Sequence, residues 1–347
     1  MKTVKLRIND REIETTEGKT VLEAAKEAGI YIPTLCYHPT VKPFGGCRIC
    51  IVEIEKMRGF PTSCSTPVAE GMVVRTNTSQ LDHLRRGVLE LIITEHPYEC
   101  LTCPANRRCE LQEVAGKIGM KEITLPYIEK NLPAYRSDPF FDRDYNLCIL
   151  CGRCVRVCDE VRGANTIAFT QRSSKTVIST AFGQPLKDAG CQFCGACVDA
   201  CPTGALQERA RKWEGEGDKK VLTTCPYCGV GCQLNLTVKN GHIIESVPDA
   251  DNDVNRGQAC VKGRFGIAEF VHHPDRLKQP LIKKDGQFVE ASWDEALDLV
   301  ASKLSGFKKE EVAVLASARC TNEENYVTQK FARMVLGGNN VDHCARL

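Results

Sequence analysis

The chain has 347 residues, of which 42% are hydrophobic and 26% are charged, and its formal net charge is +2. This length allows two or three ordinary domains, and the composition is that of a soluble globular protein. The apolar runs fall short of the ~18 residues that a membrane helix needs, and the mixture of basic and acidic residues argues against nucleic-acid binding. Because the first residues, MKTVKLRINDREIE, contain no apolar signal core, we expect a cytoplasmic protein without a membrane span.

The 21 cysteines are the most informative feature of the sequence. In a large chain without a signal peptide, cysteines favour metal ligation over disulfides. All but two of them fall into five sets whose spacing is typical of iron–sulfur clusters. Because such clusters carry electrons, we predict an electron-conducting protein. We expect its fold class to be α+β with several domains.

Residues 1–77 are predicted to form a small sheet packed on one helix. Alternating residues at 2–9 and 11–16 indicate two strands, and Thr20-Val21-Leu22-Glu23 is a capping box that opens a helix ended by Gly29. A glycine-rich loop follows, in which backbone amides can approach sulfur atoms. This loop carries three cysteines, and a fourth lies on a later segment. Together they form a C-x10-C-x2-C-x13-C set: Cys36, Cys47, Cys50 and Cys64. We predict a [2Fe-2S] cluster at this set, with zinc as the alternative.

The spacing of this first set departs from that of plant ferredoxins. It resembles instead the amino-terminal domain of the respiratory complex I large subunit and of iron-only hydrogenases. That resemblance implies a β-grasp [2Fe-2S] ferredoxin-like domain over residues 1–77.

Residues 78–120 are predicted to form a helical module, because residues 78–95 carry apolar positions at helical spacing. The helix leads into a His-x3-Cys-x2-Cys-x5-Cys pattern: His96, Cys100, Cys103 and Cys109. This pattern supplies three cysteine ligands, one fewer than a [4Fe-4S] cluster needs. In the respiratory complex I large subunit and in iron-only hydrogenases, a histidine is the fourth ligand. The resemblance therefore implies that His96 completes a [4Fe-4S] set. His83, on the helix without such company, is assigned no role.

The pattern Cys-x2-Cys-x2-Cys-x3-Cys occurs twice, 43 residues apart, beginning at Cys148 and at Cys191. Residues 138–210 thereby resemble the bacterial two-cluster ferredoxins, in which the fourth cysteine of each run ligates the other cluster. The resemblance implies two [4Fe-4S] clusters, one held by Cys148, Cys151, Cys154 and Cys201 and the other by Cys158, Cys191, Cys194 and Cys197. The first run has Asp159 where a proline is usual. Independent zinc sites are the alternative, although they require no matched runs.

Residues 209–220, RARKWEGEGDKK, are charged and contain glycine, so we interpret them as a linker that ends near residue 219. The strand-like KKVLTT then leads to a C-x2-C-x3-C-x27-C set: Cys225, Cys228, Cys232 and Cys260. A zinc ribbon also fits this set. Following the preceding modules, however, residues 219–275 resemble the amino-terminal [4Fe-4S] domain of molybdopterin oxidoreductases. Lys262 matches a lysine that lies between cluster and pterin in that family, which implies an electron relay, whereas an ordinary surface lysine is the alternative.

Residues 276–347 are predicted to begin the α/β catalytic domain of that family, incomplete in this chain. ASWDEALDLVASKLSGF has the pattern of an amphipathic helix, and EVAVLASARC begins a strand, loop and helix. The resemblance implies that Ser317 to Asn325 contact the pterin guanine dinucleotides. Cys320 and Cys344 belong to no set, and we predict that they are buried structural thiols.

The ending NNVDHCARL resembles the segment of cytoplasmic formate dehydrogenases that precedes the selenocysteine or cysteine bound to molybdenum or tungsten. The resemblance implies no catalytic residue within the chain, the metal ligand being expected directly after Leu347. Our hypothesis is a selenoprotein whose sequence stops at the selenocysteine codon. A cloned fragment and a natural truncated product are the alternatives, and in each case the chain alone is expected to be inactive.

For the whole protein, the resemblance implies oxidation of formate to carbon dioxide at a molybdenum or tungsten bis(molybdopterin guanine dinucleotide). Electrons would leave singly, first to the Cys225 cluster, then through the two ferredoxin clusters, the His96 cluster and the [2Fe-2S] cluster. The cofactors expected within the chain are one [2Fe-2S] and four [4Fe-4S] clusters. The implied partners are a diaphorase-type flavin subunit that uses NAD(P), a ferredoxin or a hydrogenase subunit.

Three rival functions remain open. Iron-only hydrogenases share the first three modules, but Cys225-Pro-Tyr-Cys228 stands in place of their catalytic motifs. The complex I large subunit is similar at both ends, yet it ordinarily lacks the doubled ferredoxin run. A stand-alone electron-transfer protein is the non-enzymatic alternative.

Overall fold

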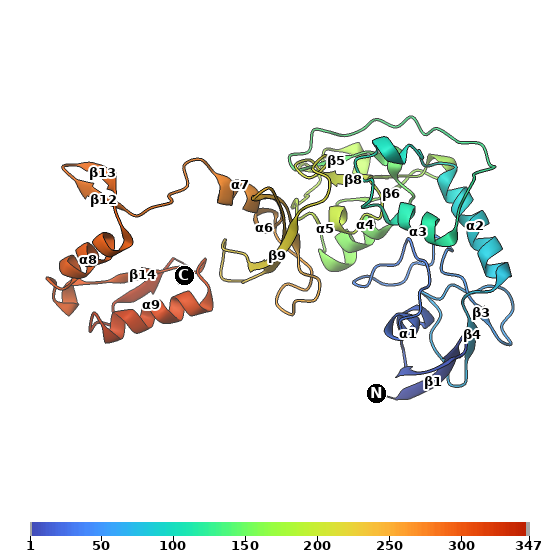
Figure 1. Cartoon of the computed structure of the whole chain (residues 1–347), viewed down its shortest axis with the longest axis horizontal. Helices are drawn as coiled ribbons and strands as arrows, with labels where there is room; N and C mark the ends of the chain where they lie inside the picture. The colour runs from blue at the N-terminus through green and yellow to red at the C-terminus, as the bar shows by residue number, and fades with distance from the viewer. Residues whose placement is uncertain (1, 345–347) are drawn as a thin grey trace. The chain divides into compact units, whose positions relative to one another are not determined.

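The chain divides into two units, residues 1–215 and 216–347, and the computed structural model describes residues 2–344 (Figure 1). Each unit contains helices and strands, in keeping with a mixed α/β architecture. Among residues 2–344, none of the helices combines the length and apolar character that crossing a bilayer requires. The end of NNVDHCARL, residues 345–347, and the metal ligand expected after it lie outside the described residues.

The amino-terminal domain contains a four-stranded mixed sheet in the order β2-β1-β4-β3. Its strands are β1 (Thr3–Ile8), β2 (Arg11–Thr16), β3 (Glu53–Ile54) and β4 (Val73–Arg75). Strand β1 pairs antiparallel with β2 and parallel with β4. Alternate residues of β1, Val4, Leu6 and Ile8, are buried while their neighbours are exposed, which confirms the period-two pattern predicted from the sequence.

Helix α1 (Val21–Glu27) packs its buried face, which includes Val21 and Leu22, into the same core as β1. The predicted capping box is confirmed, because the Glu23 amide donates to Thr20 Oγ1 at 3.3 Å and the Thr20 amide donates to the Glu23 carboxylate at 2.8 Å. Gly29 follows the helix with φ of 70°, the left-handed conformation in which glycine is favoured.

The helical module contains α2 (Ser79–Ile93), the short 3-10 helix η1 (Cys100–Thr102) and α3 (Glu110–Ile118). Thr78 caps α2 through its side chain. Leu89 of α2 and Leu111 of α3 share one buried cluster with Leu35 and Ile49 of the amino-terminal domain. The module and the first domain are therefore held together by a common apolar core.

The ferredoxin-like module begins and ends in one two-stranded antiparallel sheet, in which β5 (Phe141–Arg143) pairs with β8 (Leu206–Glu208). Between these strands lie a second small sheet and several short helices. They are η2 (Tyr145–Leu147), α4 (Arg153–Arg156), the π-helix η3 (Val157–Val161), β6 (Ala168–Thr170), η4 (Ser173–Lys175), β7 (Val177–Ser179), η5 (Ala181–Gly183) and α5 (Ala196–Asp199).

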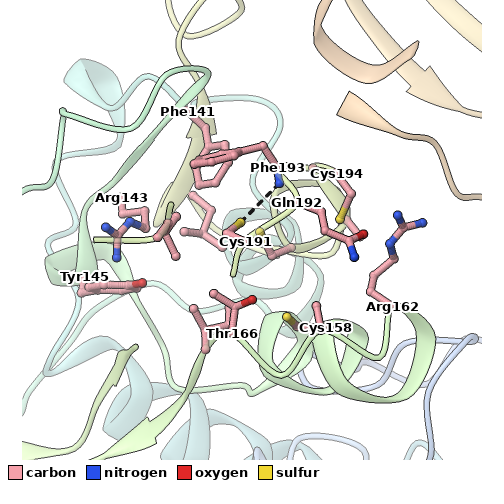
Figure 2. Close-up of a pocket in the computed structure, with 17 residues that line it drawn as sticks. Phe141, Arg143, Tyr145, Cys158, Arg162, Thr166, Cys191, Gln192, Phe193 and Cys194 are labelled. Carbon is pink, nitrogen blue, oxygen red and sulfur yellow. Dashed lines mark hydrogen bonds between the residues drawn. The ribbon is translucent and has the colours of Figure 1, made fainter. Parts of the chain in front are cut away.

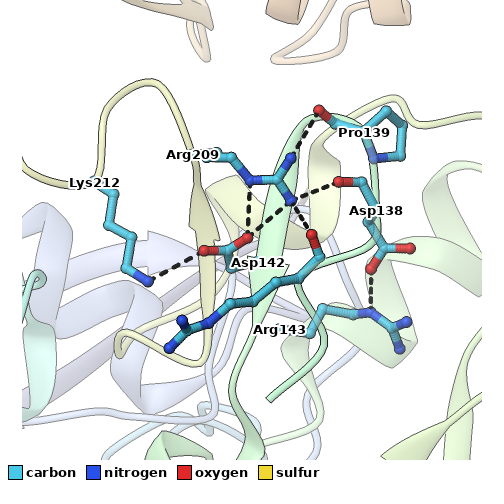
Figure 3. A network of polar contacts seen from close by, with 7 residues as sticks. Asp138, Pro139, Asp142, Arg143, Arg209 and Lys212 are labelled. Carbon is cyan, nitrogen blue, oxygen red and sulfur yellow. Dashed lines mark hydrogen bonds and ion pairs between the residues drawn. The ribbon is translucent and has the colours of Figure 1, made fainter.

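The first part of the predicted linker is wrong, because residues 209–212 are bound to the ferredoxin-like module (Figure 3). Arg209 donates to the carbonyls of Arg136 and Asp138 at 2.7 and 2.6 Å, and Arg209 and Lys212 both contact the Asp142 carboxylate. Burial opposes ionisation of Asp142, but these two partners outweigh it and lower its pKa. The glycines after residue 214 mark the boundary instead, since the second unit begins at Glu216.

The second unit opens with a three-stranded antiparallel sheet in the order β11-β10-β9. Its strands are β9 (Lys219–Thr224), β10 (Gln233–Lys239) and β11 (His242–Pro248), followed by helices α6 (Val261–Phe265) and α7 (Ile267–His272). The predicted turn at Asn240-Gly241 is confirmed, with both residues at positive φ. Leu234 of β10 is fully buried in a core that includes Cys225.

The remainder of the second unit forms a hairpin, a helix and a strand–helix–strand unit. The helix and the strand and helix after it were predicted from the sequence, whereas the hairpin and the last strand were not. Helix α8 is amphipathic, yet none of its residues is buried. Strands β14 and β15 pair in parallel. The elements are β12 (Leu281–Lys284), β13 (Gln287–Glu290), α8 (Trp293–Leu304), η6 (Lys309–Glu311), β14 (Val314–Ala316), α9 (Asn322–Met334) and β15 (Val341–His343).

The capping box of α1 gives a direct test of the amino-terminal domain. Thr20→Ala removes the side-chain acceptor, and we expect the α1 amides to exchange with solvent about fivefold faster, equivalent to ~1 kcal/mol. Hydrogen-exchange mass spectrometry measures this change. Thr20→Ser keeps the hydroxyl and should exchange like the wild type, whereas equal rates in all three proteins would contradict the assigned role of the cap.

Candidate iron–sulfur sites

The structure gathers the four cysteines of the first set around one loop. Cys36, Cys50 and Cys64 are buried and Cys47 is half-buried. Hydrogen bonds from the thiols of Cys47 and Cys64 lower the pKa of Cys36, and Cys64 also hydrogen-bonds Cys50. The Gly46 amide donates to Cys36, and a Cβ at Gly46 would lie 2.4 Å from the Phe44 ring. The absence of a side chain at Gly46 therefore leaves room for the Phe44 ring beside the amide that donates to Cys36.

The three cysteines of the second set lie on or beside η1 and at the start of α3. Burial raises the pKa of Cys100 and of Cys109, and the charge of Cys103 raises both further. These three thiols are thus electrostatically coupled.

The buried His96 lies just after α2, and burial lowers the pKa of its imidazole to about 4. Its ring hydrogen-bonds the Leu147 carbonyl, but within residues 2–344 its Nδ1 atom is buried without a hydrogen-bond partner. A neutral imidazole with one free ring nitrogen is the form of histidine that binds metal. His96 therefore fits a ligand role, although its pKa responds to burial and to Lys130 rather than to the three thiols.

The internal repeat of the ferredoxin-like module extends to its backbone. The amides of Leu150 and Phe193 donate to the sulfurs of Cys148 and Cys191 at 3.3 and 3.4 Å. Leu150 and Phe193 both have positive φ, of 52° and 49°, and Gly152 and Gly195 follow with the same sign of φ. Residues other than glycine rarely adopt this conformation, at a cost of ~1–3 kcal/mol each. The two runs are thus matched turns that aim amides at sulfur.

The fourth cysteine of each run lies near the other run. Burial raises the pKa of Cys148 to about 11 and of Cys151 to about 12, and the charge of Cys201 raises both further. In the same way, burial raises the pKa of Cys191 and of Cys197, and Cys158 adds to both shifts. Cys201 therefore lies close to the first run and Cys158 close to the second. The crossed assignment of these cysteines to two clusters stays a prediction.

Figure 2 shows a cavity bordered by the sulfurs of Cys158, Cys191 and Cys194, with Cys197 also lining it. The rings of Phe141 and Phe193 pack together at its edge, with centroids 6.2 Å apart. The cavity wall is therefore partly apolar and carries four thiols, which suits a buried cluster better than a hydrated ion.

The fifth set lies in the second unit. Cys225 follows β9, Cys232 precedes β10, and their backbones are joined by a hydrogen bond of 2.8 Å. Burial raises the pKa of both thiols, and the charges of Cys228 and Cys260 add to both shifts. Lys262 lies on α6 and is exposed.

No group of three or more His, Cys, Asp or Glu side chains in residues 2–344 is arranged around the position of a single metal ion. An iron–sulfur cluster distributes its protein ligands over several iron atoms, so these ligands need not surround one point.

Two arginines that were not singled out in the sequence connect these sites. Arg156, on α4, donates to the Lys42 carbonyl at 2.7 Å and to the Cys36 carbonyl, and its guanidinium lies over the Phe44 ring. It thereby ties the loop of the first set to the helix between Cys154 and Cys158. Arg153 forms a paired hydrogen bond of 2.7 and 2.8 Å with the Glu110 carboxylate of α3. Only the three-dimensional fold brings these partners together.

In the region expected to contact pterin, Ser317 and Asn325 line a groove beside α9 and β15. The side-chain amide of Asn325 donates to the carbonyls of Ser317 and Thr321, both at 3.1 Å, so it holds the loop in shape. The prediction that Cys320 and Cys344 are buried is wrong: Cys344 is exposed, 3.7 Å from Ser317 Oγ, and Cys320 is half-buried. The two-stranded β14–β15 sheet is too small to enclose them.

The role of Arg156 can be tested by Arg156→Met, which removes both carbonyl contacts but keeps an apolar stem over Phe44. Hydrogen bonds to charged groups contribute ~1.5–3 kcal/mol when buried, and this side chain is half-buried. We therefore expect residues 36–47 to exchange about tenfold faster in hydrogen-exchange mass spectrometry. Arg172→Met, at an exposed position of the same module, is the matched control. Unchanged exchange in the Arg156 variant would contradict the docking role.

Five family models match consecutive parts of the chain. They describe a 2Fe-2S iron-sulfur cluster binding domain (residues 1–79), an NADH-ubiquinone oxidoreductase-G iron-sulfur binding region (85–124), an NADH-quinone oxidoreductase subunit 3 ferredoxin-like domain (138–207), a molybdopterin oxidoreductase Fe4S4 domain (218–273) and a molybdopterin oxidoreductase (276–347). Each of the five predicted ligand sets falls within these matches.

Three curated relatives illustrate the range of similar proteins. An NADH-quinone oxidoreductase subunit of Rhizobium meliloti (strain 1021) is 38% identical, and NADPH-Fe(3+) oxidoreductase subunit alpha of Geobacter sulfurreducens (strain ATCC 51573 / DSM 12127 / PCA) is 37% identical, each over 99% of this chain. A Bacillus subtilis (strain 168) protein with the provisional name formate dehydrogenase is 33% identical over 100% of the chain. The chain spans 40% of the length of each relative.

Among solved structures, a chain of an NAD+-reducing [NiFe]-hydrogenase in the H2-reduced state is similar. It is 30% identical with a TM-score of 0.57, and the match covers 62% of this chain and 92% of that one.

Proposed function

Since the chain belongs to the iron–sulfur electron-transfer subunits of the molybdopterin oxidoreductase family, we propose that it carries electrons between a pterin-type site and an NAD(P)-linked partner. The observation that carries this proposal is that groups of thiols whose charges raise one another's pKa recur along the chain. In the ferredoxin-like module these groups pair Cys148 with Cys201 and Cys191 with Cys158. The names of the relatives support an NAD(P)-linked partner, which we propose to be a diaphorase-type flavin subunit or a hydrogenase subunit, with a ferredoxin as another acceptor.

We propose the five ligand sets as predicted from the sequence, namely one for a [2Fe-2S] cluster in a β-grasp domain and four for [4Fe-4S] clusters. The free Nδ1 atom of His96, the amides aimed at Cys148 and Cys191 and the thiol-lined cavity of Figure 2 support these assignments. When bound, iron–sulfur clusters accept and release single electrons. The protein contributes buried thiols that exclude water, amide donors that stabilise negative sulfur, and cations such as Arg153 beside Cys151 and Cys201.

The crossed ligand assignment makes a sharp prediction for double variants. Cys148→Ala combined with Cys201→Ala should remove one cluster, or about four irons, because both residues serve the same cluster. Cys191→Ala combined with Cys201→Ala should remove two clusters, or about eight irons. Iron and sulfide analysis of the anaerobically purified protein measures both losses.

The single variants serve as controls, since each should lose about four irons. Uncrossed ligation would reverse the result of the two double variants. Zinc in place of iron at any set would contradict the cluster assignment of that set.

We further propose formate as the substrate of the full-length protein, oxidised at a molybdenum or tungsten bis(molybdopterin guanine dinucleotide). The C–H bond of formate breaks and carbon loses two electrons, so that carbon dioxide, one proton and two electrons are released. Two observations support formate: the resemblance of NNVDHCARL to formate dehydrogenases and the provisional name of the Bacillus subtilis relative. The other relatives favour a second candidate, in which NADH or NADPH is the electron source.

The two candidates differ in what reduces the clusters. We expect [13C]formate alone to bleach the visible cluster absorbance of the full-length protein anaerobically and to release labelled carbon dioxide. Reduction by NADPH or NADH with the partner subunit, together with no response to formate, would reject formate and leave the electron-transfer assignment intact. A protein without cluster absorbance would reject both.

A further inference from the structure

Lys130 lies in an irregular segment between the helical module and the ferredoxin-like module, outside the matched ranges 85–124 and 138–207. We call residues 124–132 the strap. At one end the Leu125 amide donates to the Glu90 carboxylate at 3.0 Å, and in the middle the Ile128 amide donates to the Thr94 carbonyl at 2.7 Å. At the other end Leu132 exchanges two hydrogen bonds with Asn146, of 2.9 and 2.8 Å. The strap is therefore fixed along its length.

The strap holds the Lys130 side chain between two proposed cluster sites. Its ammonium donates to the Cys148 carbonyl at 2.7 Å and lies 3.8 Å from the carboxylate of Glu95, the residue before His96. Only 16% of the side chain is exposed, compared with 39% for Glu95. Burial lowers the pKa of Lys130, and the charges of Cys148 and Glu95 oppose that lowering. The ammonium is thus held beside Cys148 and close to the residue that precedes His96, where little water screens its charge.

The electrostatic environment of both sites includes this charge. Burial is the main cause of the shifts at His96 and Cys148, and the charge of Lys130 additionally lowers the pKa of each. The second ferredoxin set has neighbours of both signs. Burial is again the main cause of the raised pKa of Cys191 and of Cys197, and Asp138 and Asp199 add to these shifts, whereas Arg143 and Arg162 line the cavity beside these thiols.

We propose that the tethered ammonium of Lys130 raises the reduction potentials of both the His96 cluster and the Cys148 cluster. This inference rests on the proposed function, since it requires clusters at both sets. Reduction adds negative charge to a cluster, and a nearby cation stabilises the reduced form.

The test is an anaerobic redox titration of the full-length, cluster-loaded protein, followed by electron paramagnetic resonance. Lys130→Gln removes the charge and keeps a hydrogen-bond donor for the Cys148 carbonyl. We expect the ratio of reduced to oxidised cluster at a fixed potential to fall on the order of tenfold for both clusters, equivalent to about 59 mV for one electron. Lys130→Arg keeps the charge and should restore values near those of the wild type.

Lys121→Gln, at an exposed position shortly before the strap, is the matched charge control and should leave both titrations unchanged. Iron content is measured first. Wild-type protein lacking either cluster would overturn the proposed ligand sets, whereas Lys130→Gln with full iron content and unchanged potentials would overturn the role of Lys130 alone. A shift in only one cluster would overturn its shared action on two.

Discussion

The rest of the structure depends on holding several thiols together in places that exclude water. Burial and neighbouring thiolates both oppose ionisation, as the raised pKa values of Cys148 and Cys151 illustrate. Backbone amides at Leu150 and Phe193 and the cation of Arg153 oppose this penalty. In the ferredoxin-like module, the backbone amides reach the sulfurs through tight turns, strained φ angles and short helices. This module therefore has little regular secondary structure.

The sequence predicts features that depend on local spacing. The capping box at Thr20, the strands β1 and β2, the turn at Asn240 and the doubled cysteine pattern all depend on residues close together in the chain. The sites that pair distant residues are harder to predict. Arg156 meets Cys36 across 120 positions, and nothing in the sequence around either residue signals this contact. The same holds for Lys130 and Cys148, whose contact depends on the path of the strap.

The errors have a common physical origin. The charged composition of residues 209–220 suggested a linker, but Arg209 and Lys212 are held by the buried Asp142. Cys320 and Cys344 were expected to be buried because unpaired cysteines usually are, yet the small β14–β15 sheet leaves them accessible. In both cases composition describes the residue, whereas its partners decide its environment.

The pairing of β5 with β8 has a consequence for how such proteins arise. Because Phe141 lies opposite Glu208, the chain enters and leaves the ferredoxin-like module at the same place. A module with adjacent ends can be inserted into, or removed from, a longer polypeptide with little disturbance to its surroundings. Evolution can thus lengthen or shorten a chain of redox centres by whole modules, which offers a structural reason for finding similar segments in hydrogenase and quinone reductase relatives.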